Sequence, residues 1–264
     1  MNLWKRNNVW ISGEGDTTMV FAHGFGCDQT MWRCVAPTFS ARFRTVLFDH
    51  VGSGNSDLSA YDFSKYQTLQ GYAADVNELL DYLGGDHVIF VGHSVSAMIG
   101  MLADLDKPNR IIRHVMIGPS PCYVNDLEYV GGFERSDIDQ LLQSLEANYL
   151  GWSRKMAPVI MGAPDRPALG QELTDSFCRT DPEIAKHFAR ATFLSDHRAE
   201  LHRLRTRSLI LQCDDDVIAP LTVGRYMHRQ MPNSVLRVVR NVGHCPQLSA
   251  PNECLDAMNE FLSD

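Results

Sequence analysis

One serine stands at a sharp turn between an expected strand and an expected helix. The apolar, mostly β-branched residues 88–91 lead into the pentapeptide 92–96, Gly-His-Ser-Val-Ser, and residues 97–100 favour a helix. A serine hydroxyl is a weak nucleophile unless the chain holds it clear of the backbone beside a base, and a tight strand-to-helix turn does this. We therefore predict that Ser94 is a nucleophile at the end of a buried strand.

The last position of this turn departs from the usual Gly-x-Ser-x-Gly pattern, because Ser96 stands where glycine is common. A side chain as small as serine is expected to fit there. The alternative is an ordinary Gly-Ser turn that joins a strand to a helix without any chemistry. Residues suited to the other catalytic roles favour the nucleophile.

An acid and a base follow Ser94 in the chain order that this kind of turn requires. The apolar run 208–213 ends in three aspartates, and we predict that the last of them, Asp216, orients the base, with Asp215 as the alternative. His244 follows another expected strand and is the candidate base, because histidine exchanges protons near neutral pH. A run of aspartates is also typical of a solvated turn, and a Gly-His pair is often incidental, but their order behind strands favours catalysis.

An oxyanion hole is expected at the end of an earlier strand. Residues 18–22 are apolar and lead into 23–26, His-Gly-Phe-Gly, where glycine lets the backbone approach a ligand closely. The backbone N–H groups of Phe25 and Val95 are the candidate donors to a developing oxyanion. The alternative is a plain turn between strand and helix.

Longer stretches of the chain carry a family resemblance. They are the segments 23–29, 47–54, 66–72, 92–100, 119–126, 131–134, 148–152, 195–198, 210–213 and 243–249. In these stretches the chain resembles the α/β-hydrolases, and more narrowly the RsbQ-like subgroup, which holds a bacterial stress-signalling hydrolase and the plant strigolactone and karrikin receptors. Residues 213, 218–220 and 245–246 look more like the bacterial member. The resemblance places the family's catalytic triad on Ser94, Asp216 and His244.

The expected fold class is α/β. Strand-like runs alternate with helical stretches in 1–118 and 206–264, which indicates a mostly parallel central sheet with helices on both faces, whereas 119–205 reads as an inserted cap of about four helices. A cap over the carboxyl ends of the strands forms a pocket. The resemblance implies an apolar lining that includes Phe25, Val95 and Met156, and the predicted substrate-binding residues are Tyr123, Phe133, Trp152, Phe177 and Phe193.

Composition excludes several other classes. The formal net charge is −8 and no cluster of Lys and Arg is present, so nucleic acid is not an expected partner. No run approaches the roughly 20 apolar residues of a membrane span, and the start lacks a signal-peptide pattern, so a cytoplasmic location is expected. The seven cysteines and ten histidines show no ligand spacing. We expect neither a metal nor a cofactor.

Two functions are consistent with these residues. The first is a serine hydrolase, a carboxylic-ester hydrolase that acts on a small hydrophobic ester, lactone or related acyl compound. The second is a signalling or receptor module that binds or slowly hydrolyses a small effector; here the resemblance implies a PAS-domain stress-response protein as partner. Serine at position 94 argues against dehalogenases and epoxide hydrolases, which use an aspartate nucleophile. A cofactor-free lyase or a carbon–carbon bond hydrolase stays open.

Overall fold

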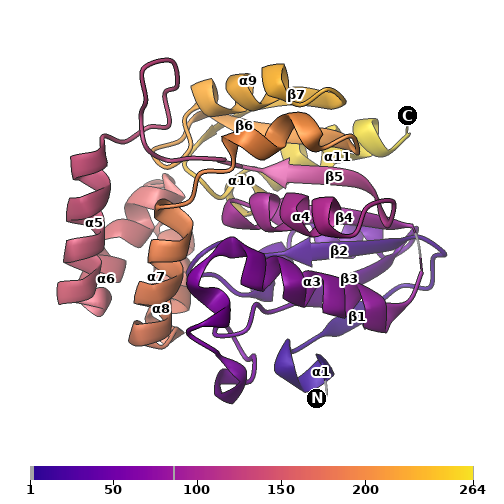
Figure 1. Ribbon diagram of the computed structural model, residues 1–264, viewed down its shortest axis with the longest axis horizontal. Coiled ribbons are helices and arrows are strands. Elements are labelled where there is room, and N and C mark those ends of the chain that lie inside the picture. Colours follow the sequence, from indigo (N-terminus) through magenta and orange to yellow (C-terminus); the bar gives the residue numbers. More distant parts are fainter. Residues whose placement is uncertain (1–2, 86, 264) are drawn as a thin grey trace.

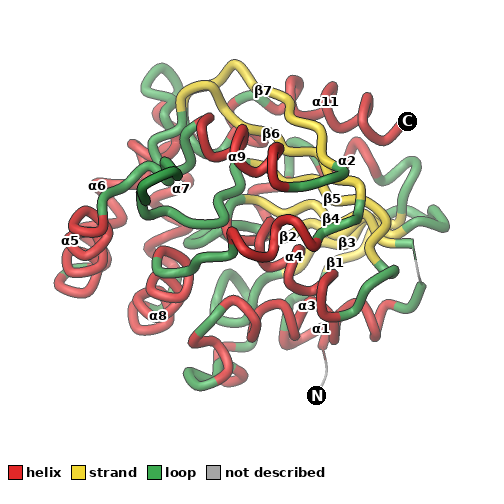
Figure 2. The backbone as a smooth tube through the Cα atoms, turned by 45° about the horizontal axis from the view of Figure 1, so that its top comes forward, coloured by secondary structure: helices red, strands yellow, loops and turns green. Residues whose placement is uncertain are grey.

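The computed structural model describes residues 3–85 and 87–263. Its centre is a seven-stranded sheet in the order β1-β3-β2-β4-β5-β6-β7, in which β1 is antiparallel to β3 and all other neighbours are parallel. Figure 2 shows the strands as one twisted layer. The strands are β1 (Trp10–Ser12), β2 (Thr18–Ala22), β3 (Arg44–Phe48), β4 (Val88–His93), β5 (Ile111–Ile117), β6 (Arg207–Asp215) and β7 (Ser234–Val242).

Helices cover both faces of this sheet because its central strands are apolar on both sides. In β4, Ile89 and Val91 belong to one apolar cluster, whereas Val88 and Phe90 belong to the other, as the two-residue period of a strand requires. The helices are α1 (Leu3–Arg6), α2 (Ala36–Phe39), α3 (Leu69–Leu83), α4 (Val95–Asp106), α5 (Arg135–Ala147), α6 (Tyr149–Met161), α7 (Pro167–Arg179), α8 (Pro182–Phe193), α9 (Leu221–Gln230), α10 (Pro246–Ser249) and α11 (Pro251–Ser263).

Four of these helices, α5 to α8, follow one another between β5 and β6 and lie together at one end of the sheet (Figure 1). Asn148 caps α6 by accepting a hydrogen bond from the Gly151 N–H, and Asp181 caps α8 through the N–H groups of Glu183 and Ile184. These caps and the turns between the helices make four short helices instead of one long one. The group covers the edge where β4, β5 and β6 end.

The predicted fold class is confirmed, including the mostly parallel sheet and the inserted helices. The antiparallel β1 strand was not predicted, because three residues give too short a pattern to read. The division into a core of 1–118 and 206–264 and a cap of 119–205 stays a prediction about domains. In the described residues, 3–85 and 87–263, no helix has both the length and the apolar character that crossing a membrane requires.

Candidate active site

Ser94 occupies a strained backbone turn between β4 and α4. Its φ of +56° and ψ of −125° lie outside the regions that residues other than glycine ordinarily adopt. The turn is held because the Ser94 N–H donates to the Ile117 carbonyl at 2.8 Å. A Cβ at Gly92 would lie 2.6 Å from the Ser96 carbonyl oxygen, so glycine is required where the strand meets the helix. This geometry raises the Ser94 side chain above the end of the sheet.

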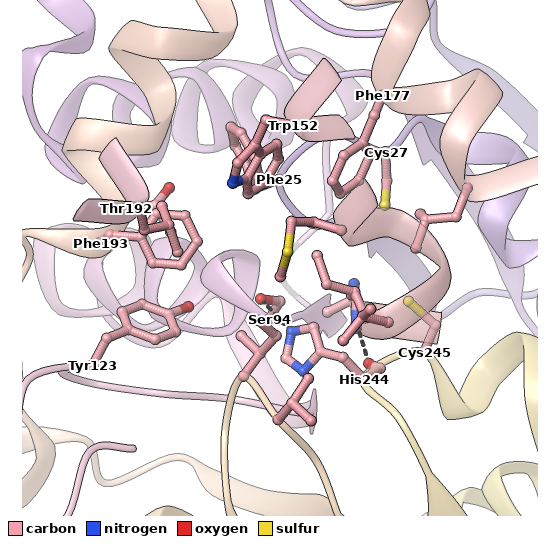
Figure 3. Close-up of a pocket in the computed structure, with 18 of the residues that line it drawn as sticks. Phe25, Cys27, Ser94, Tyr123, Trp152, Phe177, Thr192, Phe193, His244 and Cys245 are labelled. Atoms are coloured by element: carbon pink, nitrogen blue, oxygen red, sulfur yellow. Dashed lines mark hydrogen bonds between the residues drawn. The ribbon is translucent and has the colours of Figure 1, made fainter. Parts of the chain in front are cut away.

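His244 and Asp216 complete a continuous hydrogen-bonded row with Ser94. The Ser94 Oγ lies 2.8 Å from His244 Nε2, and His244 Nδ1 lies 2.7 Å from Asp216 Oδ2. All three residues are buried. Figure 3 shows Ser94 and His244 side by side beneath the aromatic side chains of the pocket. Because Asp216 accepts a hydrogen bond from His244 Nδ1–H, Nε2 carries no proton and can accept one from the serine hydroxyl.

The Asp216 carboxyl is held as a carboxylate. Burial alone would raise its pKa, but the attraction of His244 and hydrogen bonds from His244 and from the N–H groups of Ile218 and Ala219 lower the pKa below its usual value. Asp215, the alternative acid, is exposed at the end of β6. The structure therefore brings Asp216, and not Asp215, to His244.

The loop after β2 lies directly against the serine. A Cβ at Gly24 would lie 2.6 Å from His93 Nδ1 and 3.2 Å from the Ser94 Cβ, so only glycine allows this approach. Val95 is the first residue of α4, and its N–H is one of the first four in the helix, which have no acceptor within it. The N–H-bearing residues Phe25 and Val95 thus flank the serine from two elements.

A cavity of about 170 Å³ opens above Ser94 and His244. Among the described residues, the ionisable side chains that line it are those of two histidines, two cysteines and one tyrosine: His93, His244, Cys27, Cys245 and Tyr123. The predicted substrate-binding residues all contribute to its wall: Tyr123, Phe133, Trp152, Phe177 and Phe193, together with Phe25 and Met156. The side chain of Val95 does not; it packs into the apolar cluster on the other face of the sheet, so the expectation that it lines the pocket is wrong.

Aromatic contacts fix the shape of the cap side of the cavity. Trp152 on α6 stacks on Phe177 on α7 with ring centroids 5.9 Å apart and an interplanar angle of 7°. Phe25 touches both of these rings and also Phe193 edge-on. Such pairs stabilise a wall by apolar burial and by ring geometry. The cap therefore presents a preformed apolar surface to the serine.

Several residues at the site were not predicted. His93 donates from Nε2 to the His244 carbonyl oxygen at 2.8 Å, and burial lowers the pKa of His93 to about 3. Cys27, Thr192 and Cys245 also line the cavity. The Gly-His-Ser sequence was the one available signal for His93.

Tyr123, a predicted substrate-binding residue, also faces the serine. Burial raises the pKa of Tyr123 to about 12, and its hydroxyl points toward Ser94 (Figure 3).

In the part of the chain that the structure describes, no group of three or more His, Cys, Asp or Glu side chains is arranged to hold a metal ion. His244 is already bonded to Asp216 and Ser94. The geometry supports nucleophilic attack by a serine that is hydrogen-bonded to a histidine.

A parallel sheet with a strand–serine–helix turn and a histidine–aspartate pair on later loops defines the α/β-hydrolase class. A model of the alpha/beta hydrolase family matches residues 19–257. The chain belongs to the alpha/beta hydrolase family.

Individual relatives narrow this assignment. A strigolactone esterase of Arabidopsis thaliana is 37% identical over 262 residues, 99% of this chain and 98% of the relative. A karrikin insensitive 2 receptor of Petunia hybrida is 37% identical over 93% of this chain and 92% of its own length. The solved structure of a hydrolase from Oleispira antarctica has a TM-score of 0.96 and 43% identity, and covers 100% of this chain and 97% of that one.

These similarities confirm the predicted α/β-fold hydrolase and the resemblance to the strigolactone and karrikin receptors. The closer likeness to the bacterial RsbQ, the PAS-domain partner and the cytoplasmic location stay predictions. So do the catalytic roles of the individual residues.

Proposed function

We propose that the protein is a serine hydrolase that cleaves a small, uncharged, hydrophobic ester or lactone. The observation that carries this proposal is the unbroken hydrogen-bonded row from Ser94 through His244 to Asp216, at the floor of an apolar cavity. Relatives named as esterases support it. A row of this kind has no structural necessity, because three buried polar side chains contribute less to stability than apolar ones of the same size.

The reaction proceeds in two halves. The Ser94 Oγ attacks the carbonyl carbon while its proton moves to His244 Nε2, and the carbonyl oxygen becomes an oxyanion that accepts hydrogen bonds from the N–H groups of Phe25 and Val95. His244 then gives the proton to the departing alkoxide oxygen, which leaves an acyl group on Ser94. Water completes the reaction: its proton passes to His244 as its oxygen bonds to the acyl carbon. The bond between that carbon and the Ser94 oxygen then breaks, the Ser94 oxygen takes the proton back from His244, and the carboxylic acid leaves.

The cavity limits the substrate. Its volume of about 170 Å³ is close to that of a cavity that accommodates benzene, which is about 150 Å³. In the part of the chain that the structure describes, no Lys or Arg side chain lines the cavity, so none is placed to bind an anionic group there. The buried part of the substrate is therefore a short acyl chain or a single ring without charge.

A receptor role is the second candidate. The observation that favours it is the similarity over more than nine-tenths of the chain to proteins named as karrikin receptors. In this role the same residues capture or slowly cleave a small effector, and the protein acts through a partner. The RsbQ-like resemblance implies a PAS-domain protein as that partner.

One experiment tests the proposal and separates the two candidates. Hydrolysis of 4-nitrophenyl acetate is measured for the wild type and for Ser94→Ala, with circular dichroism to show that both are folded. We expect the wild type to turn over the ester and Ser94→Ala to lower this turnover by three or more orders of magnitude. Loss of the nucleophile has an effect of this size in other serine hydrolases. Equal turnover by a folded Ser94→Ala protein would falsify the proposal. Turnover that depends on Ser94 but takes minutes per cycle favours the receptor role.

A further inference from the structure

A second hydrogen-bonded row lies beneath the site and takes no part in the steps above. It consists of Ser96 on α4, His50 after β3 and His23 after β2, whose side chains are no more than 1% exposed. Ser96 Oγ lies 2.7 Å from His50 Nε2 and 2.5 Å from the His23 carbonyl oxygen. Ser96 is the residue that departs from the usual Gly-x-Ser-x-Gly pattern, so a chain with the common glycine has no side chain there to join such a row.

The direction of each hydrogen bond follows from the number of protons. The Ser96 hydroxyl has one proton and donates it to the His23 carbonyl, so it must accept from His50 Nε2–H. His50 Nδ1 has no hydrogen-bond partner within residues 3–85 and 87–263. Burial, and after it repulsion from His23, holds the pKa of His50 well below its ordinary value. His50 is therefore a neutral, fixed donor to Ser96.

The His23 side chain connects this row to the loop after β2 by hydrogen bonds. The backbone N–H of His50 donates to His23 Nε2 at 3.0 Å, so the His23 proton is on Nδ1 and is donated to the Gly24 carbonyl oxygen at 2.8 Å. The Cys27 N–H donates to the same oxygen at 3.2 Å. The Gly24 carbonyl is thus held from the side that faces the protein interior.

The Gly24 carbonyl and the Phe25 N–H belong to one peptide group. This group is planar and trans, so its C=O and N–H point in opposite directions. A carbonyl tied into the interior directs the Phe25 N–H away from it. Gly24 packs against Ser94, so the peptide group that carries the Phe25 N–H lies beside the serine.

We propose that Ser96 and His50 are positioning residues that hold the loop after β2 so that the Phe25 N–H faces the oxyanion formed at Ser94. The inference rests on the proposed serine chemistry and adds the residues that orient one of its donors. It also accounts for a serine at position 96, where the common glycine offers no hydroxyl.

A purely structural role predicts something different. His50 packs edge-on against Phe48 and Tyr72, so its loss lowers stability in either case. A positioning role further requires that kcat falls while KM is kept, because an oxyanion donor acts in the transition state and not on the bound ester.

The first test compares Ser96→Ala with a matched control, Ser208→Ala. Ser208 is equally buried and donates to a backbone carbonyl, that of Thr206, at the opposite end of the sheet from Ser94. With 4-nitrophenyl acetate, Ser96→Ala is expected to lower kcat about tenfold and to keep KM within twofold of wild type. This loss is smaller than the loss caused by removing a whole oxyanion-hole donor, because the Phe25 N–H is misdirected but still present. Ser208→Ala is expected to keep kcat. An unchanged kcat in folded Ser96→Ala overturns the inference.

A second test uses rescue at position 50. His50→Leu removes the donor to Ser96, whereas His50→Gln retains a side-chain N–H. The inference expects kcat to recover in His50→Gln at least halfway, on a logarithmic scale, from the His50→Leu value to that of wild type. If the two variants are equally slow, the hydrogen bond is not what orients the loop, and the inference fails.

Phenylboronic acid supplies a readout apart from turnover. The Ser94 oxygen bonds to its boron while the serine proton passes to His244. One boron-bound oxygen of the resulting tetrahedral anion occupies the place of the oxyanion. Ser96→Ala is expected to weaken its inhibition by the same factor as kcat/KM. Should wild type show no Ser94-dependent turnover and no inhibition, the proposed function itself fails; full wild-type activity with an unaffected Ser96→Ala rejects only the positioning role.

Discussion

The two walls of the cavity are built on different principles. The wall from the sheet loops is polar and tied by hydrogen bonds: Ser94, His244 and Asp216 form one row, and His93 fixes the His244 carbonyl. The wall from α5 to α8 is apolar and held by ring contacts such as Trp152 on Phe177. Hydrogen bonds fix the distance and the direction between a donor and its acceptor, whereas apolar packing fixes the volume that the side chains enclose.

This difference indicates a division of labour. In the proposed reaction, the groups that stabilise a developing charge come from the sheet loops, and the groups that exclude water and select substrates by size come from the inserted helices. Substitutions in the two walls should therefore change different kinetic constants: kcat for the polar wall, and the preference among substrates for the apolar wall.

The largest effect is expected for His244→Ala. Without the base, the Ser94 proton has no acceptor, so kcat for 4-nitrophenyl acetate should fall about 10⁴-fold while KM changes little. Stopped assays over hours measure the residual rate. Imidazole added to the variant should restore part of it, and a variant that keeps a tenth of wild-type kcat would remove the chemistry from this wall.

Asp216→Asn comes next. The amide keeps the shape of the side chain but donates to His244 Nδ1 instead of accepting, so the histidine takes the wrong tautomer and kcat should fall about 10³-fold. Asp215→Asn on the exposed neighbour is the matched control and should keep kcat within twofold. If Asp215→Asn is the more damaging of the two, the assignment of the acid is wrong.

The sequence predicted what depends on short segments. The turn at Ser94 follows from a strand, two small residues and a helix start, and the order of Asp216 and His244 follows from where strands end. Asp215 and Asp216 could be ranked but not separated, because only the fold shows that one carboxylate meets His244 and the other faces solvent.

What the sequence did not predict depends on contacts between distant segments. Ser96 and His50 are 46 positions apart, and nothing in either segment reveals that their side chains meet. The side chain of Val95 points to the opposite apolar cluster because the first turn of α4 rotates it there, a consequence of how the helix packs on β4. Cavity volume likewise follows from the packing of four helices and not from their composition.

The polar wall should also make stability depend on pH, through His93. Burial lowers its pKa to about 3, whereas an unfolded histidine titrates near 6.5. Between these values the unfolded state binds a proton that the folded state does not, so stability is complete above pH 6.5 and falls as pH decreases toward 3. At pH 5 the loss due to His93 is about 2 kcal/mol, roughly a 30-fold shift in the folding equilibrium.

The variant His93→Gln isolates this contribution, because glutamine keeps a donor for the His244 carbonyl but does not titrate. Urea unfolding at pH 8 and pH 5 gives the difference in free energy for each protein. The difference should be smaller in His93→Gln by that amount. An equal difference in both proteins would show that His93 is protonated in the folded state or that the loop opens before it titrates.

The smallest effect is expected in the apolar wall, and it bears most directly on the comparison. Met156 on α6 lines the cavity and is only partly buried, so Met156→Ala enlarges the cavity at a modest cost in stability. The ratio of kcat/KM for 4-nitrophenyl hexanoate to that for the acetate should rise about tenfold, since methylene groups in an apolar pocket change specificity by 10- to 200-fold. Leu150→Ala, on the same helix but outside the cavity, should leave the ratio unchanged. If Met156→Ala instead lowers kcat for both esters equally, then the cap also helps to orient the reacting groups, and the two walls are not separable in function.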